Sequence, residues 1–217
     1  MQRSIPRRIV LVVGSLVLAL IGFNGCARQL EDQSVTLGVI TKAVDELDSS
    51  VHQRIVNAKD DLFARLSGRL MQEMQAAGPA SAIKVCREEA PQIAAAVSQE
   101  NGLKIARTSL KLRNPKNAPP TWVNSVIQKQ PEEPQFFELA DGKTGALLPI
   151  KLQNTCLICH GPKENMLDEV KMALAQLYPD DQATGYNEGD LRGWFWIEAP
   201  LNASPEIGDA QDAVDGI

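Results

Sequence analysis

Apolar residues in the first third of the chain recur every three or four positions, which is the period of an α-helix. The stripe runs through Leu37, Ile40, Val44, Leu47, Val51, Ile55, Leu62, Leu66, Leu70 and Met74. Residues 30–77 contain no proline, and Gly78-Pro79 follows them. We therefore expect a long helical segment over residues 26–78, as one helix or two in succession. It would pack along the domain or pair with a second copy of the chain.

A second helical stripe lies between Pro79 and Asn101 and places Cys86 on its apolar face. Pro91 interrupts this stretch. Because proline has no N–H to donate to the Arg87 carbonyl, the helix should bend or restart there.

From Leu103 onward short apolar stretches with a period of two indicate β-strands. Strands are expected within residues 103–110, 136–139, 146–150 and 193–198, with a helix over 163–178. Asp141-Gly142 is typical of a hairpin turn, and Pro149 confines its strand to an edge or a bulge. The fold class is therefore α+β, an antiparallel sheet with flanking helices preceded by a long N-terminal helix.

The N-terminus has the arrangement of a secretory signal peptide over residues 1–25. Arg3, Arg7 and Arg8 precede an uncharged apolar run over 9–21, which is short for a membrane span. The run ends at Phe23-Asn24-Gly25-Cys26, which resembles the cleavage box of a bacterial lipoprotein with Cys26 as the lipidated residue. An ordinary cleaved signal and an uncleaved anchor are the alternatives. Each predicts an exported chain that faces the periplasm.

Charge excludes one class of partner. Removing residues 1–25 would remove three arginines and no acid, so the formal net charge of −5 would become −8. A chain this acidic offers no basic stripe for phosphates, which argues against nucleic acid. Residues 201–217 carry four acids and no base, and we expect them to form a disordered acidic tail.

The stretch Cys156-Leu157-Ile158-Cys159-His160 is the attachment signature of a c-type haem. Each cysteine sulfur adds to one vinyl group of the porphyrin, and the adjacent histidine binds the iron from one side. The spacing matters because two sulfurs and one imidazole must meet one rigid ring. The sequence therefore predicts one covalently attached haem c on Cys156, Cys159 and His160.

The residues leave the second iron ligand open. If Cys26 carries lipid and the motif carries haem, Cys86 has no partner, and its apolar-face position makes it the best candidate by elimination. The other candidates are an open site, His52, Met71, Met74, Met166 and Met172. Arg107 and Arg113 are candidate partners of the haem propionates, since a guanidinium matches a carboxylate as a bidentate fork. Two solvated arginines are the alternative.

Two alternatives to haem use the same cysteines. Cys86, Cys156, Cys159 and a histidine suit a structural Cys₃His zinc site, and Cys156 with Cys159 suits a redox dithiol. Export, His160 and the following Gly161 favour haem. With two histidines in the chain and no phosphate-binding glycine loop, we expect an electron carrier or sensor rather than an enzyme.

Several motifs occur together within about residues 80–200: 82–86, Ala90-Pro91, 107–115, Asn117, Pro119, Pro149-Ile150, 156–161 and 189–193. This combination resembles the exported single-haem c-type cytochrome family of PAS-like fold, whose members are stand-alone haem proteins or sensor domains of histidine kinases. The resemblance implies a PAS-like antiparallel sheet with flanking helices over residues 79–200. It also implies an iron held by the residues at the matching positions, His160 and Cys86.

Two functions are expected from this resemblance. The first is low-potential electron transfer or redox sensing with an unidentified redox partner protein. The second is gas sensing, in which the cysteine leaves the iron and NO or CO takes its place.

Overall fold

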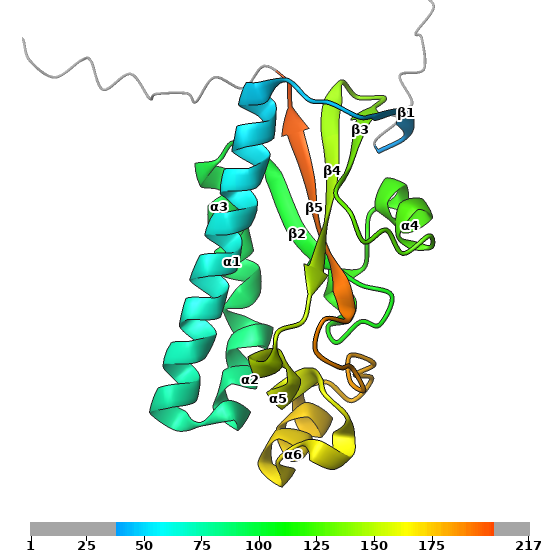
Figure 1. Cartoon of the computed structure of the whole chain (residues 1–217). Helices are drawn as coiled ribbons and strands as arrows, with labels where there is room; N and C mark the ends of the chain where they lie inside the picture. Colours follow the sequence, from blue (N-terminus) through cyan, green and yellow to red (C-terminus); the bar gives the residue numbers. More distant parts are fainter. Residues whose placement is uncertain (1–37, 202–217) are drawn as a thin grey trace, which may run out of the picture. The chain divides into compact units, whose positions relative to one another are not determined.

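The computed structural model describes residues 38–201, which are built on a five-stranded antiparallel sheet (Figure 1). The strands are β1 (Ile40–Val44), β2 (Lys104–Thr108), β3 (Gln135–Leu139), β4 (Lys143–Lys151) and β5 (Leu191–Pro200), in the order β1-β3-β4-β5-β2. The helices are α1 (Ser49–Ala77), α2 (Pro79–Glu88), α3 (Ala90–Glu100), α4 (Thr121–Ile127), α5 (Leu157–His160) and α6 (Asp168–Leu177). Short 3₁₀ turns occupy Pro115–Asn117, Asn154–Cys156 and Lys163–Asn165. The predicted signal peptide, Cys26 and residues 202–217 of the acidic tail lie outside the described residues.

The predicted hairpin is confirmed. Asp141-Gly142 joins β3 to β4, with Gly142 at a φ of +74° and the Lys143 N–H donating to the Asp141 carboxylate at 3.3 Å. Pro149 lies in β4 beyond Leu147, where the pairing with β3 ends, and next to a bulge at Ile150. The strand is therefore locally an edge at the proline, as the missing N–H requires.

The N-terminal helix is shorter than expected. α1 begins after Asp48, whose carboxylate accepts the Ser50 N–H, and it ends at Gly78 with a φ of +86°. The prediction of a helix over residues 40–44 is wrong, because this stretch pairs with β3 as strand β1. Ile40 and Val44 are four residues apart, a spacing that puts side chains on one face of a strand as well as of a helix. Residues 26–37 lie outside the described part.

The second helical stretch divides where the proline predicts. α2 ends at Glu88 and α3 starts at Ala90, with Pro91 in its first turn. The restart changes the direction of the chain, so that α2 packs against α6 and α3 packs against β2. Among the described helices none is long and apolar enough to cross a membrane.

Helices cover both faces of the sheet, with α1 and α3 on one side and α4 on the other (Figure 1). β5 shows the division clearly, because Phe195 and Ile197 face α1 and α3 while Trp194 and Trp196 face α4. Alternate side chains along this strand therefore pack into two different cores, one on each face of the sheet. The helical segment shares its core with the sheet that leads to the cysteine motif.

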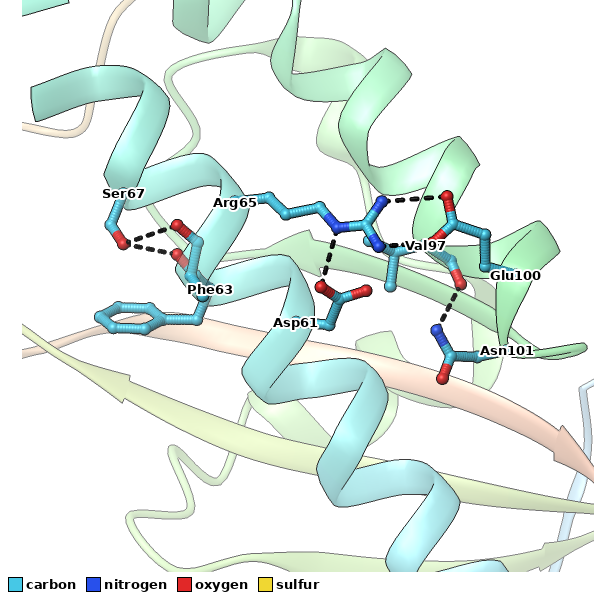
Figure 2. A network of polar contacts seen from close by, with 8 residues as sticks. Asp61, Phe63, Arg65, Ser67, Val97, Glu100 and Asn101 are labelled. Atoms are coloured by element: carbon cyan, nitrogen blue, oxygen red, sulfur yellow. Dashed lines mark hydrogen bonds and ion pairs between the residues drawn. The ribbon is translucent and has the colours of Figure 1, made fainter. Parts of the chain in front are cut away.

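Polar contacts at the surface join α1 to α3 (Figure 2). The Arg65 Nε donates to Asp61 at 2.8 Å, and its Nη1 donates to Glu100 on α3 at 3.0 Å. Asn101 closes α3 by donating to the Val97 carbonyl at 2.9 Å. The Arg65 contacts are exposed, so they align the helices and add little to stability.

Candidate functional site

Helices α2, α5 and α6 lie together at one end of the sheet (Figure 1). α2 carries Cys86, and α5 carries Cys159 and His160. The motif lies on a 3₁₀ turn and α5, directly after β4. Ile83 of α2 packs into a cluster with α6, and Cys159 packs against the same cluster. Cys86 is three residues beyond Ile83, one turn along the same face of α2. The fold therefore brings Cys86 towards the motif, about seventy residues away in sequence.

One hydrogen bond determines the form of His160. Its Nδ1 lies 2.7 Å from the Ala183 carbonyl oxygen. Because a carbonyl only accepts, Nδ1 must carry the proton and Nε2 keeps its lone pair. Burial, with Arg113 and Arg192 nearby, holds the pKa of His160 well below its ordinary value. The imidazole is thus neutral and has one nitrogen available to a metal.

The three described cysteines, Cys86, Cys156 and Cys159, are unpaired and half-buried. Burial raises the pKa of Cys159 to about 11, against the lowering effect of Arg113 and with a raising effect of the Cys86 thiol. Burial also raises the pKa of Cys86, opposed by Arg107 and Arg113. Both thiols are therefore held in the protonated form at neutral pH.

Arg113 ties the motif to the segment after α6. Its Nη2 donates to the Cys159 carbonyl at 2.5 Å and to the Ala183 carbonyl at 3.3 Å, and its Nε donates to Asp181 at 3.2 Å. The Arg113 and Asp181 side chains are each only 8% exposed. These bonds fix α5 against the loop that orients His160. The propionate role of Arg113 stays a prediction, and the guanidinium already has protein acceptors.

Arg107 is different. It lies on β2, half-buried, and its side chain forms no hydrogen bond or ion pair with any residue between 38 and 201. Burial lowers the pKa of its guanidinium, and the nearby Cys86 and Tyr178 raise it. A sheltered cation without a counter-ion is unfavourable, so Arg107 is available to an anionic group at this site. This is the property that a propionate partner needs.

Several residues at the site were not expected from sequence. Tyr178 is 5% exposed at the end of α6, and burial, with Cys86, raises its pKa to about 12. The Tyr186 ring meets the His160 ring edge-on with centroids 6.5 Å apart, and its N–H donates to the His160 carbonyl. Asp181 and Ala183 lie in the same irregular segment, where no periodic pattern marks them. Of these residues, only Arg192 was marked in the sequence, because it lies in the motif at 189–193.

Gly161 allows the chain to turn after the histidine. A Cβ there would lie 2.7 Å from the Leu157 carbonyl oxygen, closer than real Cβ atoms approach. The Gly161 carbonyl accepts the Gly185 N–H at 2.8 Å, next to the bond between Tyr186 and His160. The glycine after the motif thus lets the loop over residues 183–186 close against α5.

The other ligand candidates lie elsewhere or have other partners. His52 packs edge-on against Phe136 with ring centroids 5.8 Å apart. Met71 and Met172 are 42% and 67% exposed, and Met166 is a buried member of the α2–α6 cluster. Within residues 38–201 no group of three or more His, Cys, Asp or Glu side chains is arranged to hold a metal ion. The Cys₃His set of the zinc hypothesis is therefore not formed in the described part.

Comparison with known proteins places this geometry in context. The model of the Tll0287-like family (Tll0287) matches residues 27–200. A solved structure, titled "Crystal structure of the cyanobacterial heme-protein Tll0287", is 22% identical, covers 73% of this chain and 99% of that chain, and has a TM-score of 0.53. At this identity the likeness concerns the fold. The curated proteins include no match to the chain.

Proposed function

The chain belongs to the Tll0287-like family, and from this premise we propose that it is an exported, single-haem c-type cytochrome with His/Cys-ligated iron. Its role would be low-potential electron transfer or redox sensing. The observation that carries the proposal is the state of His160, whose Nδ1–H is held by the Ala183 carbonyl so that Nε2 keeps its lone pair for a metal. The solved relative is described in its title as a heme-protein.

The residues present fit a haem in their donor chemistry. Cys156 and Cys159 would attach the porphyrin, and His160 and Cys86 would bind the iron. Arg107, which lacks a partner within residues 38–201, would neutralise a propionate. When bound, the haem supplies a one-electron couple between ferric and ferrous iron.

Cys86 would set the direction of the reduction potential. As a thiolate it adds negative charge at the metal, which favours the ferric state and lowers the potential. Burial raises the pKa of the Cys86 thiol overall, and the nearby arginines, Arg107 and Arg113, act in the opposite direction. Their charges offset part of the cost of burying an anion.

The remaining parts of the proposal concern location and partners. Residues 1–25 would act as a signal peptide and Cys26 as a lipid anchor, which would leave the domain at the periplasmic face of a membrane. The antiparallel sheet with flanking helices supports a PAS-like arrangement. The partner would be another redox protein, and no catalytic role is assigned.

The test is a visible spectrum and redox titration of the haem-loaded protein, compared with Cys86→Ala. We expect the variant to keep its covalent haem, lose the bands of a thiolate-ligated iron and show a higher potential. Met166→Leu is the matched control, because Met166 is a buried methionine of the cluster against which Cys159 packs. Identical spectra for the wild type and Cys86→Ala would contradict His/Cys ligation.

A second arm separates the two roles. CO or NO is added to the reduced protein while the haem bands are recorded. Unmoved bands support electron transfer or redox sensing, whereas a new gas-bound spectrum would replace that role with gas sensing by displacement of the cysteine.

A further inference from the structure

A pocket of about 350 Å³ lies beside Tyr186, and no cysteine is part of its lining. Its lining comes from the start of β5, from the loop that follows β2 and from the loop that follows α4. Its lining includes Lys111, Gln130, Tyr186 and Arg192. Tyr186 therefore contributes to this pocket and also contacts His160.

The pocket carries two cations that have no counter-ion within residues 38–201. The Lys111 Nζ lies 4.9 Å from the centre of the Tyr186 ring, and the Arg192 Cζ lies 5.7 Å from it. Arg192 donates one bond, from Nη1 to the Lys111 carbonyl at 3.1 Å. Asp190 is the acidic residue of the lining, and its carboxylate accepts the Asn187 N–H at 2.7 Å. Positive charge therefore exceeds negative charge in the pocket.

Apolar surface lies beside these cations. Leu110, Leu191 and Trp194 line the pocket, and the Trp194 N–H donates to the Pro131 carbonyl at 2.8 Å. Trp194 itself is only 2% exposed, so the apolar surface open to a ligand comes from Leu110 and Leu191. The volume is at the lower end of the range for small-molecule sites, roughly 300–1,000 Å³. A small ligand with a charged end and an apolar body matches these features.

Gln130 adds strain at the same place. It is the one non-glycine residue between 38 and 201 with a positive φ, 49°. Such a conformation is unfavourable for a residue with a side chain, and it is concentrated at functional sites. The Gln130 side chain forms no hydrogen bond with another described residue, so its amide is available to a ligand.

We propose that this pocket binds a small organic carboxylate, held by Lys111 and Arg192 with its apolar body against Leu110 and Leu191. The inference rests on the pocket itself and not on the proposed haem function. No covalent or redox step is involved.

The experiment is calorimetric titration of the haem-loaded protein with benzoate, with its neutral isostere benzamide and with inorganic phosphate. Benzoate should bind at least roughly tenfold more tightly than benzamide, because a hydrogen bond to a charged group is worth more than a tenfold change in affinity. Lys111→Gln should weaken the binding of benzoate by a similar factor, and Lys111→Arg should restore that binding. Lys116→Gln, a neighbouring exposed lysine outside the lining, is the matched control and should bind as the wild type does.

Each outcome decides the proposal. Absence of benzoate binding to the haem-loaded protein would overturn it, as would equal binding of benzoate and benzamide. Phosphate binding as tightly as benzoate would overturn the organic part and leave an unselective anion site. Lys111 is exposed and its side chain makes no hydrogen bond with another described residue, so Lys111→Gln should fold normally.

Discussion

Replacing Arg113 by Met should strongly destabilise the protein. The substitution leaves the Asp181 carboxylate buried without its cation, at a pair whose N–O distance is 3.1 Å and whose side chains are each 8% exposed. Removing one partner of a buried ion pair costs about 3–5 kcal/mol, because the other charge stays desolvated. The Cys159 and Ala183 carbonyls lose a donor as well. We therefore expect a loss of at least about 3 kcal/mol.

Urea unfolding of the haem-loaded protein at neutral pH, followed by far-UV circular dichroism, measures this loss. With a slope of about 1–3 kcal/mol per molar urea, the midpoint should fall by at least roughly 1 M. The double variant Arg113→Met with Asp181→Asn should recover part of the loss, because no buried charge then remains. Arg65→Met breaks the exposed pairs on α1 and should barely move the midpoint.

Equal midpoints for Arg113→Met and Arg65→Met would refute the role of Arg113 as a buried tie. A changed haem spectrum with unchanged stability would instead assign Arg113 to the propionates. The two roles therefore give different results in the same pair of measurements.

Two further predictions concern a glycine and a tyrosine. Gly193→Ala should lose about 1–3 kcal/mol or more in thermal unfolding, because a Cβ there would collide with the Thr108 carbonyl. Gly68 lies in a helix, and an added Cβ would meet nothing within 4 Å, so Gly68→Ala should raise the free energy of unfolding by about 0.5–1 kcal/mol. A Gly193→Ala variant more stable than Gly68→Ala would contradict this reasoning. Stability should fall as pH rises from 10 to about 12, because the unfolded chain releases the Tyr178 proton near 10 while the native state holds it to about 12. Tyr178→Phe should make the free energy of unfolding depend less on pH over that range. An equally steep pH dependence in the variant would disprove the assignment to Tyr178.

Local chemistry in the sequence determined much of the fold and the centre of the site. Pro91 divides the second helical stretch and Asp141-Gly142 forms the hairpin, because each acts through its own backbone. The alternation of Trp194, Phe195, Trp196 and Ile197 marked a strand. The motif at 156–160 likewise carries its chemistry within five residues. Signals of this kind involve neighbours in the chain, so they can be read without the fold.

Only the tertiary structure decided the remaining features. Ile40 and Val44 suit a helix and a strand equally, and pairing with β3 selects the strand. The free nitrogen of His160 depends on the Ala183 carbonyl, 23 residues away in an irregular segment. Arg107 and Arg113 look alike in sequence, yet one lacks a partner within residues 38–201 and the other has three acceptors. Hydrogen-bond partners and charge burial depend on distances through space, and no period or spacing along the chain encodes them.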